Sequence, residues 1–154
     1  MAAYEHPQVT VAPPLLFLGI LIAAIALNLL VPLPVPWHTA MRSAGMFLLI
    51  GGFLLAAWAF LRMVKAGTSP DPGHAATILL TQGPYRFTRN PMYLGFALVF
   101  LGFTLLAGTF WGLVLSPVLI LVVTRLVIDP EEKHLTARFE ARYAQYSARV
   151  RRWL

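Results

Sequence analysis

Residues 91–128 read PMYLGFALVFLGFTLLAGTFWGLVLSPVLILVVTRLVI and contain one charged residue, Arg125. Only Gly108 and Thr109 interrupt this apolar run. Each half has roughly the 17 to 20 residues that an α-helix needs to cross about 30 Å of hydrocarbon. We therefore expect helices over residues 91–107 and 110–128, joined as a tight antiparallel hairpin that crosses a membrane twice.

Two further apolar runs, residues 15–31 and 44–61, have similar lengths. The composition agrees, because 58% of the residues are hydrophobic and 12% are charged, whereas a soluble domain has about 25% charged residues. The sequence predicts an all-α membrane protein with about four transmembrane helices in a single domain over residues 1–154. Small residues inside the spans are expected to allow close helix packing; among them are Gly51, Gly52, Gly95 and Gly102.

The basic residues predict the orientation of the spans. Four crossings place both termini, the 62–90 loop and the segment after residue 128 on one side of the membrane. That side carries 11 of the 12 Lys and Arg residues, and only Arg42 lies on the other. Because basic residues are retained on the cytoplasmic side, we expect an integral protein of a bacterial inner membrane with both termini in the cytoplasm.

The same bias accounts for the net charge of +6, so nucleic acid is not a predicted partner. The chain has no cysteine, which excludes disulfides and a cysteine nucleophile, and we predict no metal site.

Residues 130–150 predict an amphipathic helix of a different kind. One face of this helix carries Leu135, Phe139, Tyr143, Tyr146 and Val150. Basic residues lie mostly off this face, so the helix would lie on the cytoplasmic leaflet or pack against the bundle. Its start is predicted at Asp129 as N-cap, Pro130 as first residue and Glu132 as capping-box acid.

Two polar segments flank the 91–128 hairpin and are the candidates for chemistry. They read GPYRFTRNPMYLG over residues 83–95 and DPEE over residues 129–132. Both have simple structural interpretations, since Asn90 is a good N-cap, Pro91 is a good first helical residue, and arginines anchor cytoplasmic surfaces. Periodicity alone does not separate these interpretations from a functional one.

Taken together, the two segments resemble one family of membrane methyltransferases, typified by isoprenylcysteine carboxyl methyltransferase and the related phospholipid N-methyltransferases. The resemblance covers roughly residues 69–152 and includes Glu-Glu-x-x-Leu and Tyr-x-x-Tyr after the hairpin. Two positions depart from the family pattern. Asn90 stands where the isoprenylcysteine enzymes usually have histidine, which favours the broader bacterial branch, and Glu140 follows Phe139 where glycine is common.

The resemblance implies S-adenosylmethionine as cofactor, held on the cytosolic side between the two polar segments. Arginine suits the carboxylate of this donor, and glutamate can accept hydrogen bonds from its ammonium or ribose. Arg89, Asn90 and Glu132 are the predicted catalytic residues. The full predicted donor-binding set is Tyr85, Arg89, Asn90, Pro91, Tyr93, Gly95, Glu131 and Glu132.

The expected acceptor is a lipophilic, prenyl- or lipid-like carboxylate or thiol that enters from the bilayer, with membrane lipids as further partners. An amine acceptor needs a base, and the motifs contain no histidine; His74 and His134 are expected to be surface residues. Phospholipid N-methylation of the phosphatidylethanolamine type is the alternative. Other classes are a non-catalytic membrane subunit, a transporter, or a nicotinamide-dependent membrane reductase; a transporter would place charges deep in a span.

Overall fold

The computed structural model describes residues 12–33, 38–69 and 77–154, and every regular element in these ranges is a helix. The elements are α1 (Pro13–Leu30), α2 (Thr39–Lys65), the 3₁₀ turn η1 (Gly83–Arg86), α3 (Pro91–Ala107), α4 (Phe110–Val123), the π-helical segment η2 (Thr124–Ile128) and α5 (Asp129–Ser147). The third predicted span coincides with α3. α1 covers the first span except for Val31, and α2 extends the second span at both ends.

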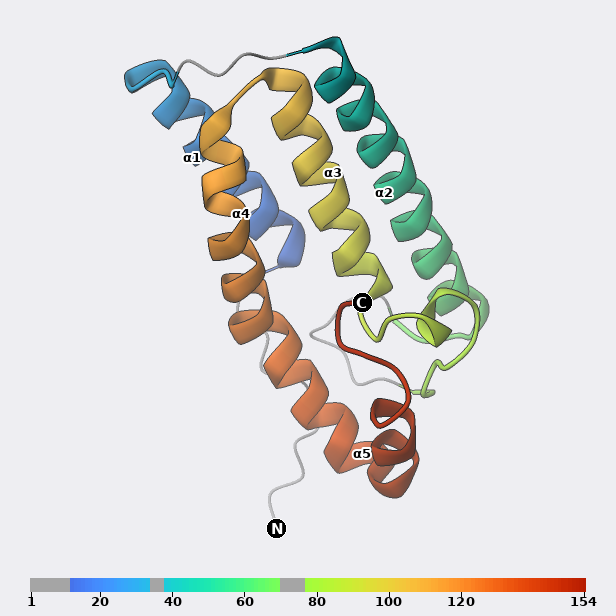
Figure 1. Ribbon diagram of the computed structural model, residues 1–154. Helices are drawn as coiled ribbons and strands as arrows, with labels where there is room; N and C mark the ends of the chain where they lie inside the picture. Colours follow the sequence, from blue (N-terminus) through green and yellow to red (C-terminus); the bar gives the residue numbers. More distant parts are fainter. Residues whose placement is uncertain (1–11, 34–37, 70–76) are drawn as a thin grey trace.

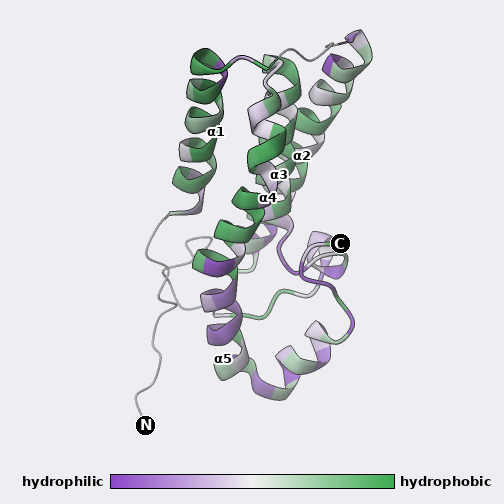
Figure 2. Ribbon diagram, turned by 60° about the vertical axis from the view of Figure 1, so that its left-hand side comes forward, coloured by the Kyte–Doolittle hydropathy of each residue, from purple (hydrophilic) through white to green (hydrophobic). Residues whose placement is uncertain are grey.

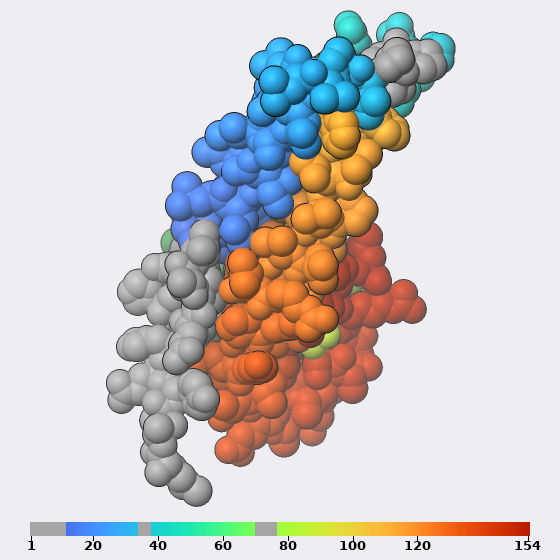
Figure 3. Space-filling model, turned by 90° about the vertical axis from the view of Figure 1, so that its left-hand side faces the viewer, coloured from blue at the N-terminus to red at the C-terminus, as the bar shows by residue number. Residues whose placement is uncertain are grey.

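The four apolar helices form an antiparallel bundle (Figure 1). α3 packs most extensively against α2, whereas α4 packs mainly against α1. Figure 3 shows α1 and α4 side by side on one face of the molecule. α3 ends at Ala107 and is followed by Gly108, whose φ of 66° is a left-handed conformation that glycine adopts easily. α4 begins at Phe110. The predicted hairpin is therefore present.

The outer surface of the bundle is apolar. α1, α2 and the helix that begins with α4 are long and apolar enough to cross a membrane, and α3 is a shorter apolar helix. Large side chains face outward on these helices; Leu29 and Phe47 are each 78% exposed. Figure 2 shows the hydrophobic bundle above a largely hydrophilic α5. Lipid covers such a surface far better than water, and the predicted fold class, an all-α integral membrane protein, is confirmed.

Basic residues gather at one end of the bundle. Arg42 lies in the first turn of α2, at the end that holds the α3–α4 hairpin. The other Lys and Arg residues lie at the end that holds α5 and the segment between α2 and α3. The polar segments that flank the hairpin therefore share this basic end.

The predicted break before residue 130 is absent, because α4, η2 and α5 form one helix over Phe110–Ser147. Asp129 is helical, with φ −60° and ψ −45°, and the structure gives it no N-cap role. Its N–H bonds to the Thr124 carbonyl, and this wider π turn relieves the pressure of the Pro130 ring on the preceding turn. The capping-box prediction for Asp129 and Glu132 is wrong, and both carboxylates bind other partners.

α5 bends sharply at Glu140, which has φ 44° and ψ −118° inside the helix. The second half of α5 packs against the turn before α3, where the Tyr146 hydroxyl donates a hydrogen bond of 2.7 Å to the Tyr85 carbonyl. Tyr143 and Tyr146 are the buried members of the predicted apolar face. The helix ends at Ser147 rather than at residue 150.

α2 and α3 approach closely because small residues line their contact. A Cβ atom on Gly52 would lie 2.6 Å from the Gly95 carbonyl oxygen, and one on Gly95 would lie 2.6 Å from that of Gly52. Gly102 packs against α2 in the same way. Membrane helices depend on such packing because lipid provides little hydrophobic drive for their association. The packing prediction holds for these three glycines, whereas Gly51 faces open space.

Candidate active site

The two polar segments that flank the hairpin meet at an ion pair. Arg89, in the turn before α3, places Nη1 3.2 Å from Oε1 of Glu132 on α5. The same nitrogen donates a hydrogen bond of 3.3 Å to the Tyr143 hydroxyl. Both charged side chains are well shielded, with 16% and 15% of their surface exposed. The fold therefore joins two residues that are far apart in the sequence.

Arg152, near the end of the chain, extends this pair into an ionic cluster of Arg89, Asp129, Glu132 and Arg152. Its Nη2 lies 2.6 Å from Oε2 of Glu132, and its Nε donates to Oε1 of Glu132 at 3.2 Å. Its Nη1 lies 3.1 Å from Oδ1 of Asp129. Glu132 is thus held by two guanidinium groups, and bidentate pairing of this kind fixes the orientation of a carboxylate.

The backbone of the C-terminal segment fastens the turn before α3. The Asn90 amide and the Thr88 hydroxyl donate to the Arg152 carbonyl at 2.9 and 3.0 Å. The Arg89 N–H donates to the Arg151 carbonyl at 2.9 Å. Asn90 occupies the N-cap position of α3, but its side chain makes no capping bond. It binds the C-terminal segment instead.

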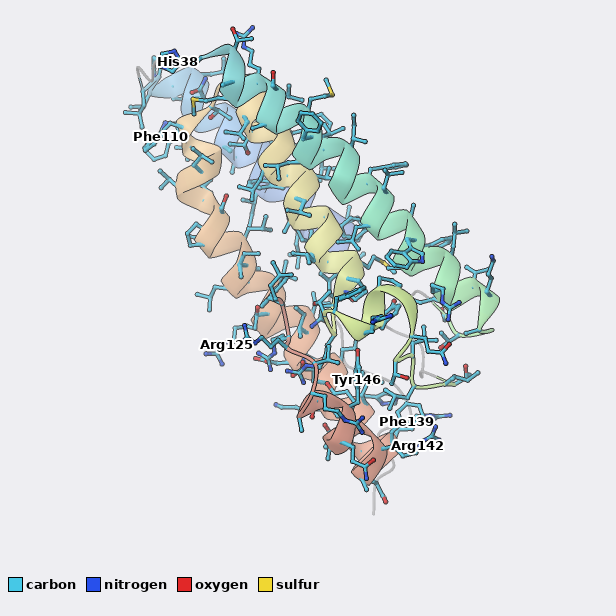
Figure 4. All side chains as sticks on the ribbon, turned by 45° about the vertical axis from the view of Figure 1, so that its right-hand side comes forward. His38, Phe110, Arg125, Phe139, Arg142 and Tyr146 are labelled. Atoms are coloured by element: carbon cyan, nitrogen blue, oxygen red, sulfur yellow. The ribbon has the colours of Figure 1, made fainter. Side chains whose placement is uncertain are left out.

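A pocket opens beside the ionic cluster. Its lining includes Met63 of α2, residues 78–80, Tyr143 and Tyr146 of α5, and the polar residues Tyr85, Arg89, Asn90, Glu131 and Glu132. Figure 4 shows Tyr146 at this end of the molecule. The pocket has a volume of about 60 Å³, whereas small-molecule pockets usually have roughly 300–1,000 Å³. A nucleoside-sized ligand therefore requires the lining side chains to move apart.

The ionisation of Glu131 is altered by its position in this pocket. Burial raises the pKa of Glu131 to about 7; the hydrogen bond from Tyr93 opposes the shift, and the charge of Glu132 adds to it. The Tyr93 hydroxyl donates to Oε2 of Glu131 at 3.0 Å. A carboxyl group with this pKa exchanges its proton near neutral pH, which is the property of a general acid or base.

The tyrosines around the pocket remain protonated. Burial raises the pKa of Tyr143 to about 12, and it also raises the pKa values of Tyr85 and Tyr146. Their hydroxyl groups are therefore hydrogen-bond donors at neutral pH.

One buried side-chain nitrogen of the pocket lining has no hydrogen-bond partner within the described part of the chain. This atom is Nε of Arg89, which is buried. A buried donor without a partner is costly. An anionic ligand such as a carboxylate would satisfy it, because guanidinium groups bind carboxylates strongly.

A comparison with protein families identifies the class of protein that carries this site. The model of a family described as phospholipid methyltransferase matches residues 40–142, which is more than half of the chain. The chain belongs to the phospholipid methyltransferase family. The match begins in α2 and ends in α5, so it contains both polar segments and the hairpin between them. Family membership implies methyltransferase activity, and the resemblance found in the sequence is confirmed.

An uncharacterised protein of Haemophilus influenzae is 36% identical to the chain over 63 residues. The alignment covers 41% of this chain and all of that relative. No solved structure gives a significant match.

The predicted donor-binding residues of this member of the phospholipid methyltransferase family fall into two groups, those that line the pocket and those that do not. Five of them line the pocket: Tyr85, Arg89, Asn90, Glu131 and Glu132. Pro91, Tyr93 and Gly95 do not line it. Tyr93 acts on the pocket through Glu131, Pro91 begins α3, and Gly95 packs against α2.

His134 does not line the pocket. His134 is 5% exposed, so the expectation of a surface position is wrong. His74 lies outside the described residues.

Arg152, Met63 and residues 78–80 are site residues that the sequence alone did not identify. In the sequence, Arg152 is one of several basic residues near the chain end. Its role follows from the fold, which brings the C-terminal segment back to the turn before α3. Residues 78–80 read Ile-Leu-Leu inside a polar loop. Such an apolar run is the signal that could have identified a pocket wall.

Proposed function

We propose that the chain is an S-adenosylmethionine-dependent methyltransferase that acts on a lipophilic acceptor at the cytosolic surface of the membrane. The observation that carries the proposal is that Arg89, Asn90, Glu131 and Glu132 line one pocket. The chain that holds this pocket belongs to the phospholipid methyltransferase family.

The pocket residues suit the charged groups of the donor. The Arg89 guanidinium, with its unpartnered Nε, matches the donor carboxylate. Glu131 and Glu132 can accept hydrogen bonds from its ammonium or ribose hydroxyls, and Met63 and Leu79 provide apolar surface for adenine. When bound, S-adenosylmethionine supplies an electrophilic methyl group.

Glu131 favours an amine as the acceptor. A protonated amine is not a nucleophile, so its proton must pass to a base before methyl transfer. The Glu131 carboxylate, with a pKa raised to about 7 by burial, accepts that proton at neutral pH. The lack of a histidine therefore no longer argues for a carboxylate or thiol acceptor, and we favour phospholipid N-methylation.

A prenyl- or lipid-like carboxylate or thiol is the second candidate acceptor. It is supported by the resemblance of residues 83–95 and 129–132 to the isoprenylcysteine enzymes. For either acceptor, Arg89 and Glu132 orient the donor, and the apolar wall excludes water from the reacting groups.

Titration calorimetry of the purified protein with S-adenosylmethionine tests donor binding. We expect Arg89→Lys and Glu132→Gln to weaken binding at least about tenfold. The first removes the paired hydrogen bonds of a guanidinium, and the second removes the negative charge of the hydrogen-bond acceptor. Lys133→Gln is the matched control, since Lys133 is adjacent, exposed and absent from the pocket lining. A folded wild-type protein that releases no heat would contradict the proposal.

Labelled donor distinguishes the acceptors. We expect the labelled methyl group in N-methylated phosphatidylethanolamine. The rate of labelling should rise with pH through 7 in the wild type, and this rise should be absent in Glu131→Gln. Label in a prenylcysteine analogue alone, with no dependence on Glu131, would favour the second acceptor.

We also propose that the α5 end faces the cytoplasm, because this end carries the basic residues. The chain has no cysteine, so Thr39→Cys and Ala137→Cys place single probes at opposite ends of the bundle. In intact cells an impermeant maleimide should label only Thr39→Cys. Labelling of Ala137→Cys alone would reverse the orientation.

A further inference from the structure

We infer that the cytosolic end of the protein carries a second polar site, which binds a phosphate group. The site is a hollow of about 500 Å³ beside α5. We name it the arginine hollow after three lining residues, Arg86, Arg142 and Arg149. Thr81 and Gln145 add polar groups to the lining.

Two separate parts of the chain form the arginine hollow. Arg142 and Gln145 lie three residues apart, so they share one face of the second half of α5. Arg149 lies in the turn that follows the helix. The bend at Glu140 separates this face from the first half of the helix. Arg86 and Thr81 come from the segment between α2 and α3. Figure 4 shows Arg142 and Tyr146 at this end of the molecule.

Among the described residues, no carboxylate pairs with any of the three arginines. In the part of the chain that the structure describes, Arg86 lies over the Phe87 ring at 4.9 Å, and Arg149 Nε donates to the Gln145 carbonyl at 3.4 Å. None of the three forms an ion pair there, and no acidic residue of the described ranges lines the hollow. By contrast, Arg89, Arg125 and Arg152 each pair with a carboxylate.

Phosphate is the anion that this lining suits. Like charges in one hollow repel one another, and a bound anion removes that repulsion. Guanidinium groups bind phosphate oxygens through paired hydrogen bonds, and the Thr81 hydroxyl and Gln145 amide can donate to further oxygens. Leu79 and Val150 give the hollow an apolar side for an organic substituent. The ligand is therefore a phosphate ester, either a soluble one or a lipid headgroup.

The arginine hollow adjoins the candidate active site. Leu79 and Tyr146 line both the hollow and the pocket. A phosphate bound between Arg86 and α5 would join the segment before α3 to the second half of α5, and would thereby restrain a wall of the pocket. Phosphate binding itself does not depend on the methyltransferase function.

The test compares two triple variants of the full-length protein in nanodiscs of neutral lipid. The first is Arg86→Gln, Arg142→Gln and Arg149→Gln. The matched control is Lys133→Gln, Arg138→Gln and Arg151→Gln, which removes the same charge from the same end without altering the hollow. The first probe is glycerol 3-phosphate, whose binding is measured as a rise in the unfolding temperature relative to chloride at equal ionic strength. The second probe is phosphatidylglycerol, whose binding is measured by native mass spectrometry.

We expect the wild-type and control proteins to bind at least one probe, and the hollow variant to bind it at least about tenfold more weakly. Binding of glycerol 3-phosphate would identify a soluble ester, and binding of phosphatidylglycerol alone would identify a headgroup. Equal loss in both variants would reveal a general effect of surface charge and overturn the inference. The inference would also be overturned if the wild type bound neither probe. The same holds if the hollow variant folded and bound a probe as strongly as the wild type.

Discussion

Arg152 is the residue that connects the C-terminal segment to both polar motifs. Its guanidinium binds Glu132 and Asp129, and its carbonyl accepts bonds from Asn90 and Thr88. The side chain is partly exposed, at 35%, so screening reduces the strength of its ion pairs.

We expect Arg152→Gln to lower the free energy of unfolding by about 1–2 kcal/mol and to weaken binding of S-adenosylmethionine. Thermal unfolding in detergent and calorimetry measure the two effects. Arg151→Gln makes the same charge change at a neighbouring exposed side chain and should do neither. Equal behaviour of the two variants would show that the ionic cluster does not hold the pocket.

Glu131 makes stability depend on pH in a direction opposite to that of most carboxylates. Its folded pKa of about 7 lies above the ordinary value of 4.5, so the native state binds more protons than the unfolded state. The stabilisation is fully present below pH 4.5 and is lost as the pH rises through 7.

We expect Glu131→Gln, which mimics the protonated form, to match the wild type at low pH. Above pH 7 it should be more stable by up to about 3 kcal/mol. Unfolding measured between pH 5 and 8 checks this, with Glu132→Gln as a contrast that should lose stability. A Glu131→Gln profile parallel to that of the wild type would show that Glu131 ionises normally.

At this scale the sequence predicted part of the site. The motif positions of Arg89 and Glu132 indicated a shared cavity, and the fold places them in contact. The ionisation of Glu131 depends on burial, and the role of Arg152 depends on a contact across 62 residues with Asn90. Neither burial nor such a contact leaves a local pattern in a single sequence.

At the scale of elements, the bend in α5 is held by a residue poorly suited to it. Glu140 has φ 44° and ψ −118°, a conformation that costs a non-glycine residue of order 1–3 kcal/mol. Glycine has no Cβ atom to clash there. Glu140 is also a position at which the sequence departs from the methyltransferase pattern, in which glycine commonly follows the residue equivalent to Phe139.

We expect Glu140→Gly to raise the free energy of unfolding by about 1 kcal/mol, whereas Glu140→Ala, which keeps the Cβ atom, should give no such gain. Thermal unfolding of both variants measures the difference. A glycine variant no more stable than the alanine variant would show that the bend is unstrained.

Hydropathy predicted α1 to α4 well, but it did not predict the continuity of α4 with α5. Asp129, Pro130 and Glu132 have the composition of a helix start, and only the π turn at η2 allows the helix to pass through Pro130. Propensity describes what a residue favours locally, and the partners of Asp129 and Glu132 in the ionic cluster override it here.

For the whole molecule, the number of helices and the hairpin followed from apolar runs and a Gly-Thr break, whereas the packing partners did not. α3 is joined to α4 by a tight turn, yet it packs most extensively against α2. The reason is the seam of small residues centred on Gly52 and Gly95, which lets the two backbones approach. This seam also positions Met63, at the end of α2, against the pocket.

Gly51 and Gly52 provide a matched pair for testing this seam. A Cβ atom at Gly52 would lie within 2.8 Å of three atoms of α3, whereas one at Gly51 would meet nothing within 4 Å. We expect Gly52→Ala to cost about 1–3 kcal/mol of stability through overpacking. Gly51→Ala should gain up to about 1 kcal/mol, because alanine favours helix. Thermal unfolding in detergent compares them directly, and calorimetry should show weaker binding of S-adenosylmethionine only in Gly52→Ala. Similar midpoints for the two variants would mean that α2 and α3 do not meet at Gly52, and the position of the pocket wall would then need another cause.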